Sequence, residues 1–422
     1  MSCCCSEKRV KIGVIGVGGR SKGLLGCLVT MPDVEIAAVC DLVPQRMEEG
    51  VKIVNEGQSA YTTQGYTDYR QILARPDIAG VIIPTSWNEH IPLAIQAMKA
   101  GKYAGIEVGG ATSLEQCWDL IRTYEETGVP VMMLENCCYG RDELMVLNMV
   151  RQGVFGEIVH CEGGYEHDLR VLAERLDVSH QRSFHHLHRN AELYPTHELG
   201  PIAKVLDINR GNRFLTLSST ACKSRGLTLR AREKWEKEPG YAELLGGGRS
   251  REFALGDVVT TVLKCANGET VVLSHDTSLP RPYSRGGCVR GTKGLWQELN
   301  ASIYIDGVSP LDQWESAEQY REKYDHPLWK KYEKDSAEAG HGGMDYFSLR
   351  AFTESVRNRT NTPIDAYDCA VWMAVTVLSE QSVSMGGALV PFPDFTNGKW
   401  IKREAPQPHE FSLDGIFPEF FE

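Results

Sequence analysis

The sequence contains no stretch of about 18 consecutive apolar residues, the length that a helix needs to cross a bilayer, which argues against a membrane-embedded protein. It is also poor in basic residues: 45 Lys and Arg stand against 56 Asp and Glu, and the formal net charge is −11. Because nucleic acids and anionic membrane surfaces are bound through positive charge, we expect neither as the main partner. A neutral small molecule fits this composition better.

Signs of export and of disulfide bonding are missing as well. The 13 cysteines are odd in number, and most lie inside apolar runs, as Cys40 and Cys265 do. This pattern predicts free thiols in a reducing compartment. The chain starts with Met-Ser-Cys-Cys-Cys-Ser and no apolar segment follows, so no signal peptide is visible and we expect a cytoplasmic protein. A removed export signal would leave the same sequence.

The first third has the pattern of a dinucleotide-binding fold. Apolar residues from Val10 to Ile15 predict a buried strand, and a helix is expected from about residue 22. This order places backbone N–H groups where a pyrophosphate would bind, whereas the alternative is a tight turn without a ligand. The cofactor contacts expected in the turn are Gly16, Gly18, Gly19, Arg20 and Ser21.

A second strand is predicted over residues 34–40, and Asp41 follows it, 25 residues after Gly16. An acid at this place accepts hydrogen bonds from a ribose diol and repels a 2′-phosphate, so NAD is favoured over NADP. The alternative role for Asp41 is a helix N-cap before Pro44.

Alternating strands and helices continue to residue 136 and predict a doubly wound parallel sheet. The strands are expected at residues 80–83, 103–106 and 130–134, and the helices at residues 90–100 and 114–125. Such sheets bind ligands at the ends of their strands, although residues there also cap helices. The cofactor contacts that we expect at these ends are Trp87, Asn88, Glu89, His90, Glu107, Val108 and Asn136.

The pattern changes after residue 136, and at 422 residues the chain is long enough for two cores. We therefore expect an NAD-binding Rossmann domain over residues 1–136 and an α+β domain for substrate binding, catalysis and oligomerisation over residues 137–422. A helix at residues 141–152 precedes strands that predict a large, open, mostly antiparallel sheet. These strands are expected at residues 157–165, 214–219, 257–265 and 269–275, and loops or exposed helices at residues 225–252 and 316–343.

This arrangement, with Asp41 closing the second strand, resembles the Gfo/Idh/MocA oxidoreductase superfamily. Its dehydrogenases carry Glu-Lys-Pro where this chain has Glu107-Val108-Gly109, so the acid/base lysine is missing. Glu-Val at this place is similar to glycoside hydrolase family 109. The other segments that resemble this family are Trp87-Asn88-Glu89-His90, Leu134-Glu135-Asn136, Arg189-Asn190, Tyr194-Pro195-Thr196-His197, Leu199-Gly200-Pro201-Ile202, Asn209-Arg210-Gly211, Arg281-Pro282-Tyr283-Ser284-Arg285 and Gly340-His341-Gly342-Gly343-Met344-Asp345.

The likeness covers residues 11–400 with two departures, since Gly109 replaces a usual proline and Glu198 a usual glycine. The resemblance implies an NAD-dependent glycosidase, similar to α-N-acetylgalactosaminidase, whose tightly bound NAD is recycled. It implies oxidation of the sugar at C3, loss of the C2 proton, elimination of the glycosidic oxygen, addition of water and re-reduction, with no net redox. The implied partner is a small glycoside or oligosaccharide, and an exposed face of the second sheet favours a homo-oligomer.

The Tyr-Pro-Thr-His segment carries the implied chemistry. Tyr194 and His197 are the expected catalytic residues, with His197 assisting transfer of the C3 hydroxyl proton and Tyr194 near C2, or the reverse. Tyr139 is a further candidate for the C2 base. The alternative is a buried tyrosine and histidine that only bond to the backbone. The residues expected to bind substrate are Arg182, Tyr194, Pro195, Thr196, His197 and Tyr283.

Metal chemistry is not expected, because the spacing of His185, His186 and His188 matches no standard site. Two other functions remain open at this point. A plain NAD-dependent sugar dehydrogenase or epimerase is disfavoured by the missing lysine. A non-catalytic protein that senses NAD and a sugar is disfavoured by Tyr194, His197 and Tyr283 occurring together.

Overall fold

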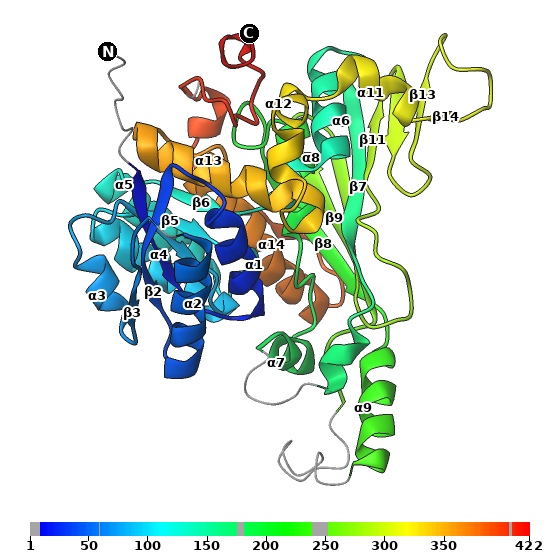
Figure 1. Cartoon of the computed structure of the whole chain (residues 1–422). Helices are drawn as coiled ribbons and strands as arrows, with labels where there is room; N and C mark the ends of the chain where they lie inside the picture. The colour runs from blue at the N-terminus through cyan, green and yellow to red at the C-terminus, as the bar shows by residue number, and fades with distance from the viewer. Residues whose placement is uncertain (1–8, 59, 175–180, 239–251, 405–406) are drawn as a thin grey trace.

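The computed structural model describes residues 9–58, 60–174, 181–238, 252–404 and 407–422. Its strands form two sheets, and helices lie between and around these sheets (Figure 1). Cys3, Cys4 and Cys5 lie outside the described residues. All ten cysteines within them are free, and nine of these are buried. No helix in the described part of the chain is both long and apolar enough to cross a membrane.

The first sheet has six parallel strands in the order β3-β2-β1-β4-β5-β6. The strands are β1 (Val10–Ile15), β2 (Val34–Cys40), β3 (Gln64–Tyr66), β4 (Gly80–Ile83), β5 (Tyr103–Ile106) and β6 (Val131–Met133). The helices that connect them are α1 (Gly19–Leu28), α2 (Pro44–Gly57), α3 (Tyr69–Leu73), α4 (Trp87–Lys99) and α5 (Leu114–Thr127). Because helices cover both faces, strands such as β4 are buried along their whole length.

The predicted doubly wound fold is confirmed, although two helices begin about one turn earlier than expected. Helix α1 starts at Gly19, and α4 starts at Trp87. Glycine has a low helix propensity and Trp87 interrupts the polar pattern of a first turn, so neither start is visible in the residue types.

Two helices from the far end of the chain, α13 (Met344–Asn358) and α14 (Ala366–Ser384), pack beside the first sheet (Figure 1). A side chain at Gly105 of β5 would meet the Phe352 ring at 3.3 Å, so the helix lies directly on the strand. Asp33, which precedes β2, accepts hydrogen bonds from Arg350 and Arg357 of α13. The domain boundary between residues 136 and 137 stays a prediction. Helices α13 and α14 come from the C-terminal side of this boundary and pack on the sheet formed by the N-terminal side.

The second sheet has nine strands in the order β14-β13-β12-β11-β7-β10-β9-β8-β15, and only the β10–β7 pair is parallel. The strands are β7 (Ile158–Glu166), β8 (Phe214–Ala221), β9 (Val258–Cys265), β10 (Thr270–Asp276), β11 (Cys288–Gly291), β12 (Gly294–Gln297), β13 (Ser302–Ile305), β14 (Glu315–Ser316) and β15 (Val390–Pro391). The predicted large, mostly antiparallel sheet is therefore confirmed. Helices α8 (Thr196–Val205) and α14 pack against one face, while β9 alternates buried and exposed residues.

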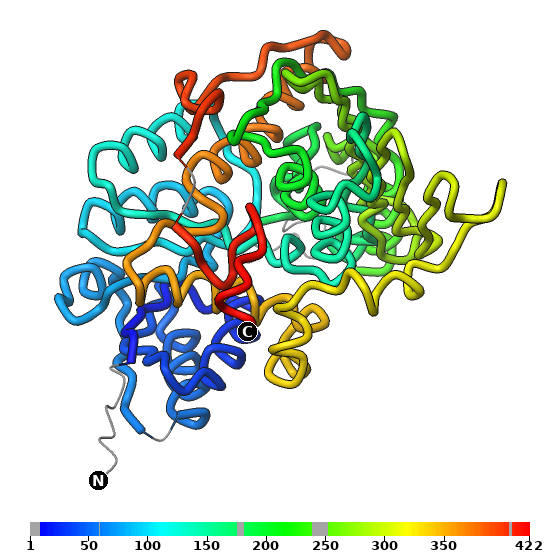
Figure 2. Tube along the Cα trace, turned by 90° about the horizontal axis from the view of Figure 1, so that it is seen from above, coloured from blue at the N-terminus to red at the C-terminus, as the bar shows by residue number. Residues whose placement is uncertain are grey.

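The remaining segments connect these layers. The helices are α6 (Arg141–Arg151), α7 (Gln181–His188), α9 (Gly226–Lys237), α11 (Glu318–Tyr324) and α12 (Pro327–Ser336), and the 3₁₀ turns are η1 (Asn136–Tyr139), η2 (Arg170–Glu174), η3 (His341–Gly343), η4 (Lys399–Ile401) and η5 (Pro418–Phe420). The charged segments expected as loops or exposed helices contain α9, α11 and α12, and residues 239–251 lie outside the described residues. Seen from above, the C-terminal segment crosses between the two halves of the molecule (Figure 2).

Candidate active site and cofactor cavity

A cavity of about 700 Å³ opens at the carboxyl ends of β1, β2, β4 and β5. Gly16 has a φ of +106°, and a side chain there would meet the Thr85 methyl group at 2.8 Å. A Cβ atom added at Gly18 or Gly19 would meet no atom within 4 Å, so no side chain covers the backbone of the turn at these two residues. This cradle and the following start of α1 suit the pyrophosphate of a dinucleotide.

Asp41 stands at the other end of this turn. Its carboxylate accepts hydrogen bonds from the backbone N–H groups of Val17 at 2.7 Å and Val43 at 2.8 Å. Helix α2 begins after Val43 without a side-chain cap, so the N-cap alternative for Asp41 is not what the structure contains. The carboxylate lines the cavity where the ribose of an adenosine would bind in this fold.

Most of the expected cofactor contacts gather at this cavity. Of the expected contacts, those that line the cavity are Gly16, Gly18, Gly19, Arg20, Asp41, Trp87, Glu89, His90, Glu107 and Val108. Ser21 does not line it, because its buried hydroxyl donates to the carbonyl of Gly16 and closes the turn from within. Asn88 is exposed on α4, and Asn136 does not line the cavity but donates to Asp345 behind its wall.

The wall of the cavity at β4 and β5 is built around Trp87. Gly109 has a φ of +155°, and a side chain there would meet the Trp87 ring at 2.4 Å. Proline, whose φ is near −65°, cannot adopt this conformation, so the departure at Gly109 makes room for the ring. The Trp87 ring lies 5.6 Å from the Tyr194 ring and thereby joins the cavity to the second half of the chain.

At the same end of the cavity Asp345 gathers residues that are distant in the sequence. Arg20 donates from Nε to Glu107 at 2.9 Å and from its two other nitrogens to Asp345 at 2.5 Å and 2.8 Å. Asn136 donates to the same Asp345 carboxylate at 2.8 Å. Asp345 carries no role in the sequence-based prediction, although it ends the Gly340–Asp345 segment of the family resemblance.

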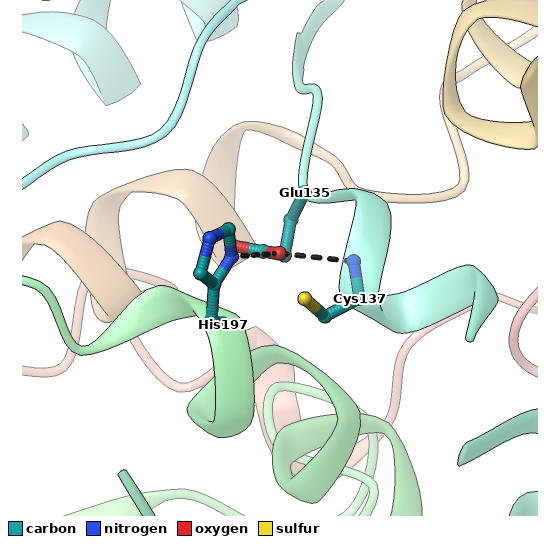
Figure 3. A group of neighbouring side chains, drawn as sticks. All are labelled: Glu135, Cys137 and His197. Atoms are coloured by element: carbon teal, nitrogen blue, oxygen red, sulfur yellow. Dashed lines mark hydrogen bonds and ion pairs between the residues drawn. The ribbon is translucent and has the colours of Figure 1, made fainter. Parts of the chain in front are cut away.

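Figure 3 shows the group around His197. His197 lies in the first turn of α8, and its Nδ1 is 2.7 Å from Oε1 of Glu135, which follows β6. Glu135 is fully buried, and the same oxygen accepts from the backbone N–H of Cys137 at 3.1 Å. Burial alone would raise the pKa of Glu135, but the charge and hydrogen bond of His197 outweigh it and lower the pKa. The sequence analysis gave Glu135 no role and named its neighbour Asn136 as a cofactor contact.

Aromatic rings surround Tyr194 and His197. The two rings lie 4.9 Å apart, and Tyr165, at the end of β7, is 4.5 Å from Tyr194 and 5.5 Å from His197. Tyr283 reaches this group from the loop between β10 and β11, 6.2 Å from Tyr165. The Arg182 guanidinium lies 4.4 Å from the Tyr194 ring centre. Tyr165 was also missed, although the alternation of β7 places it on the inner face with Cys161.

The structure separates the candidates for the C2 base. Burial raises the pKa of Tyr194 well above its ordinary value, although the Arg182 guanidinium acts in the opposite direction. Tyr139 is fully buried, and its hydroxyl donates to the backbone carbonyl of Phe411 at 2.9 Å. This placement argues against Tyr139 as a base, because its hydroxyl is engaged in the interior.

Pro195 and Thr196 are buried at the start of α8 and carry Tyr194 and His197. The next residue, the departure Glu198, is buried against the second sheet, where a side chain at Gly163 would meet its Cγ at 1.8 Å. Its carboxylate lies 3.5 Å from Arg285. Glycine at position 163 therefore supplies the room that this glutamate needs.

Glu135, Cys137 and His197 could also be considered as metal ligands, because their donor atoms lie within 4.8 Å of one another. The carboxylate and the imidazole, however, are already joined by the 2.7 Å hydrogen bond, which occupies the space of an ion. His185, His186 and His188 do not converge: Nδ1 of His186 bonds to the Arg182 carbonyl, whereas His188 packs on Phe184.

Comparison with known families divides the chain in the same way as the two sheets. Residues 10–135 match the oxidoreductase family with an NAD-binding Rossmann fold, and residues 139–402 match the C-terminal domain of glycosyl hydrolase 109. A glycosyl hydrolase family 109 protein of Stenotrophomonas maltophilia is 43% identical over 97% of this chain and 93% of its own length. An alpha-N-acetylgalactosaminidase of Tannerella forsythia is 40% identical over 94% of this chain and 89% of its own length.

Solved structures support the fold. An NAD binding oxidoreductase from Klebsiella pneumoniae aligns with a TM-score of 0.70 at 15% identity, covering 92% of this chain and 99% of that chain. A levoglucosan dehydrogenase in complex with NADH and L-sorbose aligns with a TM-score of 0.69 at 16% identity, covering 92% of this chain and 100% of that chain.

Proposed function

Because the chain belongs to glycosyl hydrolase family 109, we propose that it cleaves small glycosides or oligosaccharides with an NAD that stays bound and is recycled. The observation that carries this proposal is the position of Trp87. Its ring lines the cofactor cavity and also packs on Tyr194, so a nicotinamide at this end would lie beside the Tyr194–His197 cluster. Glycosides of α-linked N-acetylgalactosamine are the first substrates to test, because the Tannerella forsythia relative is named for them.

When bound, NAD⁺ would accept a hydride from C3 of the sugar and return it at the end of the cycle. The residues of the chain move the protons. Glu135 holds Nδ1 of His197, so Nε2, which has no bond to any described residue, is left to take the proton of the C3 hydroxyl. This arrangement resembles the use of a carboxylate to orient a catalytic imidazole and to stabilise its charged form.

Tyr194 is proposed to act near C2. Since burial raises the pKa of Tyr194, its phenol is protonated at neutral pH and must release this proton before the phenolate oxygen can accept the proton from C2. The Arg182 guanidinium over the ring favours the phenolate when the proton leaves. Tyr165 and Tyr283 supply aromatic surface on which the apolar face of a sugar ring can pack.

The direct test is incubation of the protein with NAD⁺ and p-nitrophenyl α- and β-glycosides in deuterated water. We expect release of p-nitrophenolate, deuterium at C2 of the sugar and no lasting absorbance of NADH. Steady accumulation of NADH without bond cleavage would instead identify a dehydrogenase. Phenolate release without deuterium at C2 would indicate hydrolysis by direct displacement, and would contradict the elimination route.

Two further properties belong to this proposal. The free, mostly buried cysteines support a reducing compartment, and we propose the cytoplasm. The face of the second sheet that carries exposed Thr260, Val262 and Lys264 of β9 is the surface through which we propose a homo-oligomer. Sedimentation velocity of the protein and of its Val262→Asp variant tests this surface, and equal masses for both would contradict it.

A further inference from the structure

The Arg20 side chain is anchored at the reacting end of the cofactor cavity. Its three nitrogens bond to Glu107 and to both oxygens of Asp345, and Asp345 is only 1% exposed. His341 lies against the same group, with Nδ1 3.0 Å from Asp345 and 3.1 Å from Arg20. Arg20 therefore lines the cavity with its guanidinium held between two carboxylates.

The geometry places this group beside the site of hydride transfer. Glu107 follows β5 and lines the cavity. Burial contributes most to the raised pKa of Tyr194, and the charge of the Glu107 carboxylate raises it further. In a doubly wound sheet the dinucleotide runs from the strand that ends at Asp41 across the glycine turn to the strands that end at Trp87 and Glu107. The nicotinamide end therefore meets Glu107.

Asp345 and Glu107 compete for the charge of Arg20. Burial would raise the pKa of Asp345, but the hydrogen bonds from Arg20 and His341 outweigh it and hold the pKa far below its usual range. Asp345 is thus a carboxylate that accepts hydrogen bonds from both terminal nitrogens of Arg20. Glu107 is left with Nε alone, so its carboxylate at the cavity wall shares the charge of Arg20 with Asp345.

We infer that Asp345 is a positioning residue that makes the site prefer oxidised NAD⁺ to NADH, because it draws the charge of Arg20 away from Glu107. The nicotinamide ring is cationic in NAD⁺ and neutral in NADH, so a Glu107 carboxylate that is only partly compensated by Arg20 stabilises the oxidised form selectively. This inference rests on the proposed function for the identity of the cofactor. It explains how the resting enzyme is held in the state from which a cycle starts.

The test is the ratio of the dissociation constants of NADH and NAD⁺, measured by titration without any glycoside. Asp345→Asn leaves Arg20 to neutralise Glu107, and we expect the preference for NAD⁺ to fall about tenfold, which corresponds to about 30 mV for a two-electron couple. Arg20→Gln removes the positive charge, and we expect the preference to rise. Opposite changes in the two variants cannot arise from general damage to the fold.

A matched control is Asp33→Asn. Asp33 also joins the first sheet to α13, through Arg350 and Arg357, but it does not line the cavity. This variant should lower the free energy of unfolding and leave the ratio unchanged. The inference is wrong if Asp345→Asn changes the ratio by less than twofold, if Asp33→Asn changes it equally, or if Asp345→Asn and Arg20→Gln change it in the same direction.

Failure of this inference and failure of the proposed function have different signatures. A retained preference for NAD⁺ in a protein that cleaves no glycoside contradicts the proposed function alone. Cleavage of glycosides with a ratio that neither variant changes contradicts this inference alone. A wild-type protein that binds neither nucleotide contradicts both.

Discussion

The cofactor cavity and the Tyr194–His197 cluster meet at the Trp87 ring, yet the chain builds them differently. The cavity is lined mostly by short segments that each follow a strand of one parallel sheet, and only Gln181 and Arg182 among the described lining residues come from α7. The cluster draws Glu135 from the first sheet, Tyr165 from the second, and Tyr283 from a later loop. Local order in the sequence specifies the first site, and long-range packing specifies the second.

This difference predicts that the cluster can lose its chemistry while the cavity keeps its ligand. His197→Asn removes the proposed proton acceptor, and we expect kcat to fall by about 10³-fold, in the range found for general acid–base groups. The dissociation constant of NAD⁺ should stay within about twofold of the wild-type value. Turnover of a p-nitrophenyl glycoside and a separate NAD⁺ titration measure the two quantities.

A matched control exists on the second sheet. His160 and Glu162 also form a histidine–glutamate pair, at 3.2 Å, but they lie on β7 away from the cluster. His160→Asn should retain wild-type turnover. Equal losses of turnover in His160→Asn and His197→Asn, or loss of NAD⁺ binding in His197→Asn, would show that the two sites do not behave independently.

The same difference explains how much could be predicted from the sequence. Five strands and the glycine turn of the first sheet follow from local apolar patterns, and the nucleotide contacts are expected at the strand ends, whereas the short edge strand β3 has no apolar pattern and was missed. In the second sheet only some strands were predicted. The short strands β11 to β15 were missed, as was the parallel pairing of β10 with β7, because pairing depends on which distant segments meet.

In the candidate site, sequence reasoning found Tyr194 and His197 through the Tyr-Pro-Thr-His segment, but it did not find their partners. Glu135 and Asp345 both lie inside segments that resemble the family, and nothing in their local sequence shows that one bonds to His197 and the other to Arg20. A buried carboxylate is expected to have a partner. Which partner it has is decided by tertiary packing.

Gly109→Ala should break the separation between the two sites, because Gly109 supports the ring that they share. The added methyl group would collide with Trp87, and the φ of +155° is strained for alanine. We expect a loss of about 1–3 kcal/mol in the free energy of unfolding, together with weaker NAD⁺ binding and lower kcat. Chemical denaturation and the two functional measurements test this.

The matched control is Gly101→Ala, at a turn after α4. Gly101 also has a positive φ, +72°, but no atom lies within 4 Å of an added Cβ. It should lower stability through backbone strain alone. If both variants affected NAD⁺ binding and turnover to the same degree, the role of Trp87 as the shared wall would be wrong.

Asp41→Asn should affect the cavity and spare the cluster, which is the reverse of the His197 prediction. The amide can no longer offer two charged acceptor oxygens to the turn and to a ribose, so we expect the dissociation constant of NAD⁺ to rise about tenfold. At saturating NAD⁺, kcat should remain close to wild type. Asp77→Asn, which alters a surface pair with Arg75 outside the cavity, is the control and should change neither quantity.

The smallest expected effect concerns His90, a histidine of the cavity wall. His90 is buried, and burial lowers its pKa to about 4, against a weaker opposing contribution from its bond to the Thr85 carbonyl. The unfolded chain takes up a proton near the ordinary histidine pKa of about 6.5, so the stability that neutral His90 provides is present above this pH and is lost as the pH falls toward 4. Between pH 8 and pH 5.5 this loss amounts to about 1 kcal/mol.

Urea denaturation of the wild type and of His90→Gln at both pH values measures this loss. The pH-dependent drop in the free energy of unfolding should be smaller in the variant by that amount. His160→Asn, at a half-exposed site, should keep the full drop; a His90→Gln protein that also keeps it would mean that His90 is charged inside the folded wall.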